Sequence, residues 1–241
     1  MNLTIDQGNT FTKIGIFDKE DFIDEILMEE KEVERKIIEL FAKYPIKNSI
    51  LSSVVDVSDI EVKLLKLKSK RFIELSENTP LPIKNLYKTP ATLGKDRIAA
   101  AVAVNYLEPK ANNLAIDAGT CITYDFVSSQ GEYLGGNISP GVDMRLKALN
   151  VFTKKLPLIE FDENYELLGN DTKTAILSGI VNGICFEMDG YIDTLKEKYS
   201  DLSVFLTGGN TFFFAKTLKN HIFAIPNLVL IGLNRILNYN V

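Results

Sequence analysis

Two short segments of the chain carry the same set of residues that could do chemistry. Asp6 and Asp117 each end an apolar strand, and a glycine follows two residues later, at Gly8 and Gly119. Glycine lets a backbone turn come close to a phosphate group, and a carboxylate at the end of a strand can hold a cation. One such turn by itself is typical of ordinary aspartate turns. Because this turn is repeated in the second half of the chain, we predict two related domains that face a shared cleft for phosphate and metal.

The first turn also carries groups that can neutralise phosphate charge. Four residues provide them: Gly8, Asn9, Thr10 and Lys13. The turn amides can donate hydrogen bonds to phosphate oxygens, and the lysine can offset charge that develops there. Asp6 can hold Mg²⁺ directly or through water, and in the second turn we expect the Thr120 hydroxyl to contact phosphate. Phosphoryl transfer depends mostly on such positioning and charge neutralisation.

A nucleophilic site built around histidine is not expected. The chain has a single histidine, His221, and lacks a Gly-x-Ser-x-Gly segment. Its two cysteines, Cys121 and Cys185, have no zinc-ligand spacing, and we expect both to be reduced thiols in the core. Acid and base chemistry is therefore expected from carboxylates, lysine or tyrosine.

The elements that must position these residues alternate between strands and helices. One β-hairpin starts at Leu3 and a second starts at Leu114. The remaining pattern predicts helices over 29–44, 60–70 and 172–199, a helix from near residue 96, and strands over 49–55, 71–75 and 204–209. This order predicts an α/β fold with mixed sheets flanked by helices. We expect an N-terminal domain over 1–112 and a C-terminal domain over 113–241.

The composition is typical of a globular protein and argues against several classes. The chain has 241 residues, 46% of them hydrophobic, which is enough for a sizeable core. A formal net charge of −5 argues against a nucleic-acid surface. No apolar run approaches the roughly 18 residues of a membrane span, and no basic segment precedes an apolar stretch at the start of the chain. We therefore expect a cytoplasmic protein with neither nucleic acid nor membrane as a partner.

A set of short motifs, spread over nearly the whole chain, resembles one known family. The motifs are DQGNTFTK at 6–13, Tyr87, TPATLGKDR at 89–97, DAGT at 117–120, GGNISPG at 135–141, GNDT at 169–172 and LTGG at 206–209. The two commonest phosphate-binding loops, GxxxxGK[ST] and GxGxxG, are absent from the sequence. In this order the motifs resemble the type III pantothenate kinases, within the superfamily of acetate and sugar kinases, Hsp70 and actin. The resemblance implies two ribonuclease-H-like domains with a nucleotide cleft between them.

The activity implied by this resemblance is ATP-dependent phosphorylation of pantothenate to 4′-phosphopantothenate, the opening step of coenzyme A synthesis. The implied cofactors are ATP, Mg²⁺ and a monovalent cation, K⁺ or NH₄⁺, with Asp117 beside the monovalent cation. A single carboxylate such as that of Asp117 does not by itself distinguish K⁺ from Mg²⁺. Two alternatives are a sugar kinase of the same superfamily and a non-catalytic nucleotide-binding regulator. A sugar kinase would offer Asn, Asp and Glu to several hydroxyls, and segment 79–90 offers few.

Asp96 has two interpretations. The primary hydroxyl of pantothenate must lose a proton as it attacks the γ-phosphorus, and the resemblance makes Asp96 the base. An aspartate before the apolar stretch IAAAVAV is also typical of a helix N-cap. The resemblance further implies contacts with pantothenate from Tyr87, Gly94, Lys95, Asp96, Arg97 and Thr172. Without it, Arg97 would be interpreted as one side of a surface salt bridge and Tyr87 as a residue at the edge of the core.

Thr172 stands at the start of the longest expected helix, where its hydroxyl could cap the helix or reach substrate. One face of that helix carries apolar residues at helical spacing: Ile176, Ile180, Ile184, Met188, Ile192 and Leu195. In the family this helix lies at a dimer interface. The resemblance therefore implies a homodimer in which the apolar face packs between subunits and Thr172 serves the partner's site.

The sequence departs from the family in its second hairpin, where Cys121 and Ile122 follow the Gly-Thr pair in place of two hydroxyl residues. Thr120 is then the expected hydroxyl contact of that turn.

Overall fold

The computed structural model describes residues 1–29, 32–55 and 57–241, so part of the expected helix over 29–44 lies outside the described residues. The chain folds into two compact units, and each is built from more than one segment. Unit 1 comprises Met1–Lys110, Asp125–Gly135 and Asn227–Val241, and unit 2 comprises Ala111–Tyr124 and Gly136–Pro226. The domain boundary expected at residues 112 and 113 stays a prediction.

Unit 1 contains a five-stranded mixed sheet in the order β3-β2-β1-β4-β5. Its strands are β1 (Asn2–Gln7), β2 (Thr12–Asp18), β3 (Asp21–Met28), β4 (Asn48–Ser53) and β5 (Arg71–Glu74). Strand β1 is antiparallel to β2 and parallel to β4, and β4 is parallel to β5. The sequence did not predict β3, because its acidic residues resemble those of the charged helical stretch that follows it.

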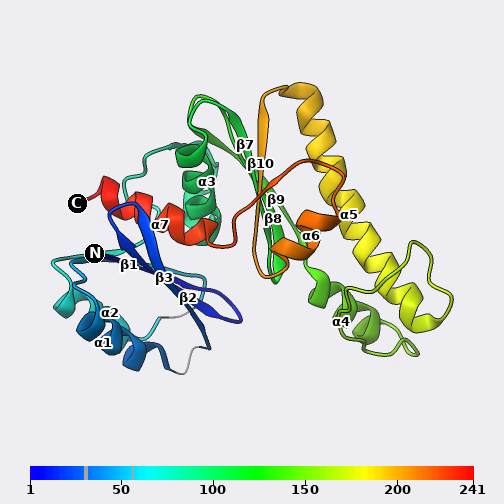
Figure 1. The fold of residues 1–241 in the computed structure, drawn as a ribbon, viewed down its shortest axis with the longest axis horizontal. Coiled ribbons are helices and arrows are strands. Elements are labelled where there is room, and N and C mark those ends of the chain that lie inside the picture. The colour runs from blue at the N-terminus through cyan, green and yellow to red at the C-terminus, as the bar shows by residue number, and fades with distance from the viewer. Residues whose placement is uncertain (30–31, 56) are drawn as a thin grey trace. The chain divides into compact units, whose positions relative to one another are not determined.

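Helices cover both faces of this sheet, as the alternation of side chains along β1 requires. Leu3 and Ile5 pack in one core cluster with residues of α1 (Val33–Lys43) and α2 (Asp59–Lys68). The opposite face meets α7 (Leu228–Tyr239), where Leu230 lies against Gly15. Figure 1 shows α7 and the α1 and α2 pair on different sides of the strands.

Helix α3 (Lys95–Leu107) packs tightly against α7 (Figure 1). Four alanines of α3 are buried: Ala99, Ala100, Ala101 and Ala103. Gly232 of α7 leaves no room for a side chain against the Ala99 backbone. Small residues on both helices thus permit a close approach, which fixes the position of the first turn of α3.

A second, six-stranded sheet has the order β11-β10-β7-β8-β9-β6. Its strands are β6 (Lys84–Asn85), β7 (Asn112–Ala118), β8 (Cys121–Val127), β9 (Glu132–Pro140), β10 (Leu202–Thr207) and β11 (Phe223–Ala224). Strand β10 is parallel to β7 and to β11, and β6 is parallel to β9. Strand β9 takes up most of the glycine-rich motif at 131–141, whose glycines and proline are unusual for a strand.

The two sheets repeat one topology. The strand order β3-β2-β1-β4-β5 of the first sheet corresponds to β9-β8-β7-β10-β11 in the second. In each copy a hairpin is followed later in the chain by a strand that adds in parallel beside its first strand. The prediction of an α/β fold with two related mixed sheets flanked by helices is confirmed.

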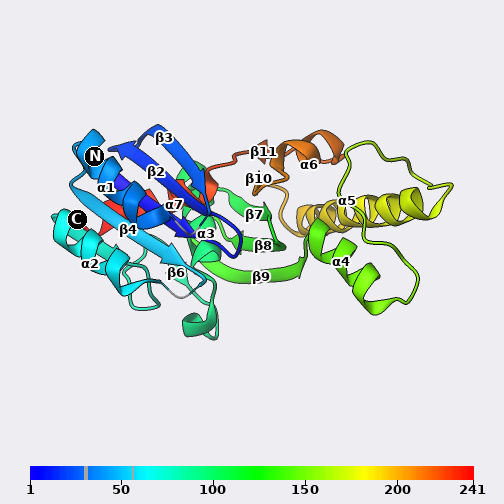
Figure 2. The same ribbon diagram turned by 90° about the horizontal axis from the view of Figure 1, so that it is seen from below.

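Three helices complete unit 2, as Figure 2 shows: α4 (Val142–Phe152), α5 (Thr172–Lys198) and α6 (Thr211–Thr217). Asp171 caps α5, because its side chain accepts a hydrogen bond from the Thr174 amide while the Thr174 hydroxyl contacts the Asp171 backbone. The expectation that Thr172 caps this helix is therefore wrong.

The apolar face of α5 is buried within a single chain. Its members are Ile176, Ile180, Ile184, Met188 and Ile192, and Leu195 is half-buried. Ile184 is completely inaccessible to solvent, so this face is not available to a second subunit. The expectation that the isoleucine stripe packs between subunits is wrong, because α4 and β10 of the same chain cover α5. In the part of the chain that is described, no helix is long and apolar enough to cross a membrane.

Candidate active site

The first hairpin places Asp6 and Lys13 directly opposite each other on β1 and β2. Paired residues of two antiparallel strands point to the same face, with their Cβ atoms about 5 Å apart. The Gly8 amide donates a hydrogen bond to the Phe11 carbonyl at 3.0 Å and closes the turn. Asn9 and Thr10 at its tip are exposed. The hairpin therefore presents a carboxylate, an ammonium group and exposed turn residues on one short segment.

The carboxylate of Asp6 is half-buried and is held by the neighbouring parallel strand. Ser52 lies opposite Asp6 in the β1–β4 pairing, and its hydroxyl donates to Asp6 Oδ1 at 3.0 Å. Beyond the strand pair, the Val54 amide donates to the Gln7 carbonyl at 3.1 Å. This arrangement fixes the orientation of a hard oxygen donor at the strand end.

The second hairpin is tighter, with only Gly119 and Thr120 between β7 and β8. The Gly119 amide donates to the Cys121 carbonyl at 3.1 Å, and Thr120 is exposed. Asp117 lies opposite Thr207 in the β7–β10 pairing. The next residue, Gly208, has φ +98°, and a Cβ there would lie 2.5 Å from Asp117 Oδ1. A glycine is thus required beside the Asp117 carboxylate, both for its backbone conformation and for space.

Gly141, the last residue of the GGNISPG motif, packs against the same hairpin. Its amide donates to the Thr120 carbonyl at 3.1 Å. A Cβ at Gly141 would lie 2.5 Å from the Thr120 carbonyl oxygen, which leaves no space for a side chain. The end of the motif at 135–141 therefore packs against the second turn and holds it in place.

The N-terminus of α3 carries three of the expected pantothenate contacts. Gly94 is the N-cap, Lys95 begins the helix and Asp96 follows in the first turn. Asp96 Oδ1 accepts a hydrogen bond from the Arg97 amide at 2.8 Å, and a Cβ at Gly94 would lie 2.5 Å from that oxygen. The interpretation of Asp96 as the N-cap is wrong. Its half-buried carboxylate lies two residues after the N-cap, close to Gly94.

Arg97 points into the interior and not to the surface. Its side chain is 6% exposed and faces Asp125, which is 1% exposed, with Arg97 Nε 2.9 Å from Asp125 Oδ1. The surface salt bridge considered from the sequence is therefore a buried ion pair. Burial by itself lowers the pKa of the guanidinium, but the charge of Asp125 and its hydrogen bond outweigh this and raise the pKa above its ordinary value.

Tyr87 completes this cluster. Its ring centroid lies 6.0 Å from that of Tyr133 and 5.9 Å from the guanidinium carbon of Arg97. Pairing of β6 with β9 fixes this position, since the Leu86 amide donates to the Tyr133 carbonyl at 3.0 Å. The structure thus brings Tyr87, Asp96 and Arg97 together. Asp125 and Tyr133 join them without having been singled out from the sequence.

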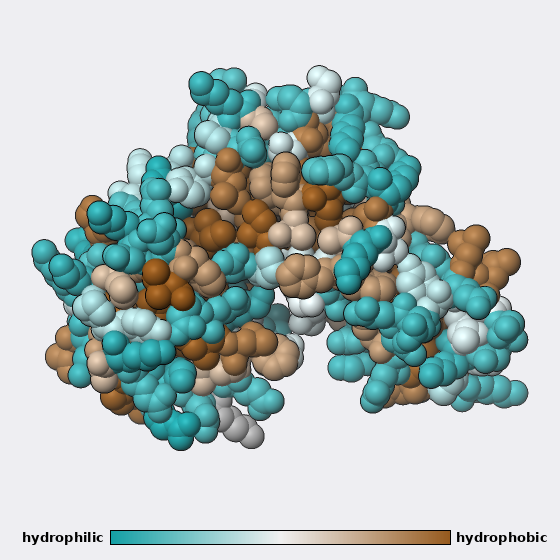
Figure 3. Space-filling view, viewed as in Figure 1, coloured by the Kyte–Doolittle hydropathy of each residue, from teal (hydrophilic) through white to brown (hydrophobic). Residues whose placement is uncertain are grey.

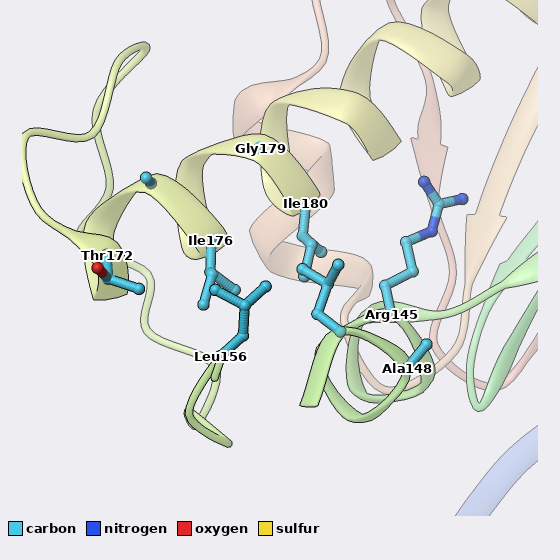
Figure 4. Close-up of a pocket in the computed structure, with 9 residues that line it drawn as sticks. Arg145, Ala148, Leu156, Thr172, Ile176, Gly179 and Ile180 are labelled. Carbon is cyan, nitrogen blue, oxygen red and sulfur yellow. The ribbon is translucent and has the colours of Figure 1, made fainter. Parts of the chain in front are cut away.

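Thr172 lies elsewhere, on unit 2, at a pocket of about 680 Å³ between α4 and α5. Figure 4 shows Thr172, Ile176 and Ile180 on α5 facing Leu156 and Arg145. The lining residues do not include Asp117 or Thr120 of the second hairpin. Thr172 therefore lines a pocket that does not include the expected phosphate and cation contacts of that hairpin.

The remaining nucleophiles behave as the sequence suggested, with one exception. His221 is exposed and its ring packs edge-on against Phe223 at 5.5 Å. Both cysteines are free thiols, and burial followed by the charge of Asp189 raises the pKa of Cys185 to about 11. Cys121 was expected in the core but is only half-buried, with its sulfur 3.8 Å from that of Met144. Over residues 1–29, 32–55 and 57–241, no three His, Cys, Asp or Glu side chains gather to hold a metal ion.

Solved structures share this fold. A protein from Campylobacter jejuni assigned to the Baf family of transcriptional activators is 23% identical, with a TM-score of 0.63 over 99% of this chain and 98% of the other. The inorganic polyphosphate/ATP-glucomannokinase of Arthrobacter sp. strain KM is 15% identical, with a TM-score of 0.54 over 99% of this chain and 98% of that one. At these identities the likeness concerns the fold alone.

Sequence relatives are much closer. A type III pantothenate kinase from Phocaeicola vulgatus is 49% identical over 240 residues, which cover 100% of this chain and 99% of that protein. The model of the type III pantothenate kinase family matches residues 2–194, a range that includes both hairpins, the start of α3 and Thr172. The chain therefore belongs to the type III pantothenate kinase family.

Proposed function

We propose that this enzyme transfers the γ-phosphoryl group of ATP to the primary hydroxyl of pantothenate, giving 4′-phosphopantothenate and ADP in the opening step of coenzyme A synthesis. The observation that carries this proposal is the family match over residues 2–194, together with full-length identity of 49% to a type III pantothenate kinase. The sugar-kinase and regulator alternatives are not favoured, because the solved structures that suggest them are related by fold only.

In this proposal the two hairpins bind the phosphates of ATP. The residues assigned to this role are Asp6, Gly8, Asn9, Thr10, Lys13 and Thr120. Asp6 is a hard oxygen donor, which suits Mg²⁺, and Mg²⁺ usually takes one or two carboxylates plus substrate phosphates and water. The described residues hold no larger acidic cluster, which agrees with that mode of binding. When bound, Mg²⁺ neutralises charge on the phosphate oxygens.

Asp96 is the proposed general base. As the pantothenate oxygen bonds to the γ-phosphorus, the bond from phosphorus to the bridging oxygen of ADP breaks, and the hydroxyl proton passes to the Asp96 carboxylate. The hydrogen bond from the Arg97 amide to Oδ1 orients this carboxylate and leaves its second oxygen for the substrate proton. Gly94 makes the orientation possible, since any side chain there would contact Asp96 Oδ1.

Pantothenate is proposed to bind at the start of α3, with contacts from Tyr87, Gly94, Lys95, Asp96 and Arg97. The Arg97 guanidinium has five N–H donors, and Asp125 faces its Nε and Nη2 edge. Nη1 is then the part of Arg97 that suits a polar group of pantothenate. The Tyr87 ring supplies an apolar wall beside it.

A monovalent cation, K⁺ or NH₄⁺, is proposed beside Asp117. Its carboxylate is half-buried and lies between the backbone of Gly119 and that of Gly208. Carboxylate and peptide oxygens are hard donors that suit such an ion.

A cytoplasmic homodimer completes the proposal. Unit 2 exposes large apolar side chains on α4, on α5 and on the segment between them: Val151, Phe152, Leu158, Leu167, Leu168 and Phe186. Figure 3 shows brown, hydrophobic surface on the part of the molecule that contains α4 and α5. Contiguous exposed apolar surface commonly marks an interface between proteins. The exposed Thr172 would then serve the partner's site. A fully active monomer in sedimentation would contradict this part of the proposal.

The experiment that tests the activity is a coupled ADP-release assay with pantothenate against a panel of sugars, in the presence of Mg²⁺ and K⁺. We expect ADP release that depends on pantothenate, with mass spectrometry showing addition of one phosphoryl group. Release with a sugar and not with pantothenate would favour the sugar kinase, and no release with any acceptor would favour the regulator.

A further inference from the structure

Arg97 is a deeply buried charge among the proposed pantothenate contacts. Its side chain is 6% exposed, and it is the third residue of α3, next to the proposed base. Taking a guanidinium out of water is costly unless a charged partner and hydrogen bonds replace the water. Its partners therefore determine where it can lie.

Arg97 and Tyr133 both donate to one oxygen atom of Asp125. Asp125 Oδ1 accepts hydrogen bonds from Arg97 Nε at 2.9 Å and from the Tyr133 hydroxyl at 2.7 Å. Arg97 Nη2 is also 2.7 Å from this oxygen, although its direction does not fit a hydrogen bond. Asp125 lies on β8 and Tyr133 on the neighbouring β9, so both are fixed by the sheet. Strands β8 and β9 thus hold the side chain of Arg97, the residue directly after Asp96.

Arg97, Asp125 and Tyr133 form a trio, and the protonation states of Arg97 and Tyr133 follow from their surroundings. Burial first, and then the charge of Asp125, raise the pKa of Tyr133 far above its usual range, so the phenol remains a donor. The pKa of Arg97 is also raised, so the guanidinium remains charged. Asp125 therefore accepts from a charged guanidinium and from a neutral phenol at neutral pH.

The trio also supports Tyr87. The Tyr87 ring packs against both Tyr133 and Arg97. Gly135 of β9 lies beside the Tyr87 ring, since a Cβ there would be in ordinary van der Waals contact with it at 3.6 Å, and its φ of +118° favours glycine. Two of the proposed pantothenate contacts, Arg97 and Tyr87, thus rest on the same two residues of the sheet.

We infer that Asp125 and Tyr133 are positioning residues that hold Arg97 and Tyr87 in the geometry needed for pantothenate. This inference rests on the proposed function. Neither side chain is assigned a contact with substrate. Their effect passes through the Arg97 guanidinium to the pantothenate side of the reaction, and it leaves the ATP side unchanged.

The test compares two buried tyrosines that differ in their partner. Tyr133→Phe removes the hydroxyl that donates to Asp125. Tyr124→Phe is the matched control, because Tyr124 is similarly buried and its hydroxyl donates to Glu187 at 2.9 Å and not to Asp125. We expect Tyr133→Phe to raise the KM for pantothenate about tenfold, as loss of one hydrogen bond to a charged group does, with the KM for ATP within about twofold. The control should change neither KM beyond about twofold, whatever its effect on Tm.

Two further measurements make the test independent of folding and turnover. Asp125→Asn should lower kcat/KM for pantothenate about a hundredfold if it folds, since a buried guanidinium loses its counter-charge. The rise in Tm on adding pantothenate without ATP should shrink in Tyr133→Phe and persist in Tyr124→Phe.

An unchanged pantothenate KM in Tyr133→Phe would overturn the inference, as would equal changes in both KM values or the same change in the control. If the unsubstituted enzyme released no ADP with pantothenate, the proposed function itself would fail. If the unsubstituted enzyme were active with pantothenate and Tyr133→Phe had the same KM for pantothenate, only the positioning role would be rejected.

Discussion

Asp6 and Asp117 occupy the same place in two copies of one topology, but the parallel strand beside each treats them differently. Beside Asp6, the Ser52 hydroxyl donates to the carboxylate. Beside Asp117, the Thr207 hydroxyl donates instead to the Pro226 carbonyl at 3.1 Å. Gly208, the residue after this strand, lies close to the Asp117 carboxylate. The Ser52 side chain holds the first aspartate, and the backbone of Gly208 lies close to the second.

This difference fits different ions. A carboxylate already oriented by a hydroxyl offers a fixed donor to Mg²⁺, which demands strict geometry and shares its remaining positions with phosphate and water. A carboxylate close to the backbone of two half-buried glycines suits a larger ion that takes several oxygens. The turns differ as well, since four residues separate β1 from β2 and two separate β7 from β8. Under the proposed function, the two copies of this topology would therefore hold different ions.

The largest effect should come from a residue that belongs to neither hairpin. If the hairpins only neutralise charge, proton transfer rests with Asp96, and Asp96→Asn should lower kcat about 10²- to 10⁴-fold while ATP binding stays intact. The carboxamide keeps the size of the side chain and can still accept the Arg97 amide hydrogen bond. Steady-state kinetics together with ATP titration measure both properties. A near-normal kcat would remove Asp96 from catalysis.

The second prediction tests the ion assigned to Asp117. Replacing K⁺ by Na⁺, with Mg²⁺ saturating, should lower activity by on the order of a hundredfold, because a missing contact to developing charge costs about 3 kcal/mol. Sodium is smaller and is poorly coordinated in a site spaced for the larger ion. Asp117→Asn should lower the rate and remove the cation dependence together. Equal rates in the two salts would leave Asp117 as a Mg²⁺ ligand or a turn former.

The sequence was sufficient to predict both hairpins, because each combines apolar alternation with an Asp-x-Gly turn. It also predicted α2 and α5, whose caps and periodicity are local signals. It did not predict β3, an acidic edge strand with mostly exposed residues. For β9, pairing with β8 and β6 overrides the low strand propensity of its glycines and proline.

The candidate site followed the same division. Motifs along the chain located Asp96 and Arg97. Asp125, the partner of Arg97, is 28 residues from Arg97 in the sequence, and the sheet brings the two together. One local signal existed. An aspartate within the apolar strand ITYDFV must be buried, and a buried carboxylate requires a partner.

The third prediction concerns the backbone beside Asp117. Gly208→Ala should destabilise the fold by about 2–4 kcal/mol, because it combines a left-handed conformation with a contact to Asp117 Oδ1. Gly209→Ala is the control, since a Cβ there meets nothing within 4 Å. Thermal unfolding of both variants, with and without K⁺, gives the comparison. Equal stability of the two variants would mean that the chain adjusts around residue 208 and that close backbone approach is dispensable.

The smallest expected effect separates the two strand neighbours themselves. Ser52→Ala removes the hydrogen bond to Asp6 Oδ1, and we expect the KM for MgATP to rise about three- to tenfold, since one such bond to a charged group is lost. Thr207→Val alters the equivalent position beside Asp117, where the single hydroxyl proton is already donated to the Pro226 carbonyl. That variant should lose some stability and keep its KM for MgATP within about twofold. The dependence of the rate on Mg²⁺ concentration at fixed ATP, measured in both variants, identifies which aspartate contributes to Mg²⁺ binding. If Thr207→Val raised this KM as much as Ser52→Ala, the two parallel strands would serve the nucleotide alike, and the distinction between a side-chain-held and a backbone-lined carboxylate would have no functional meaning.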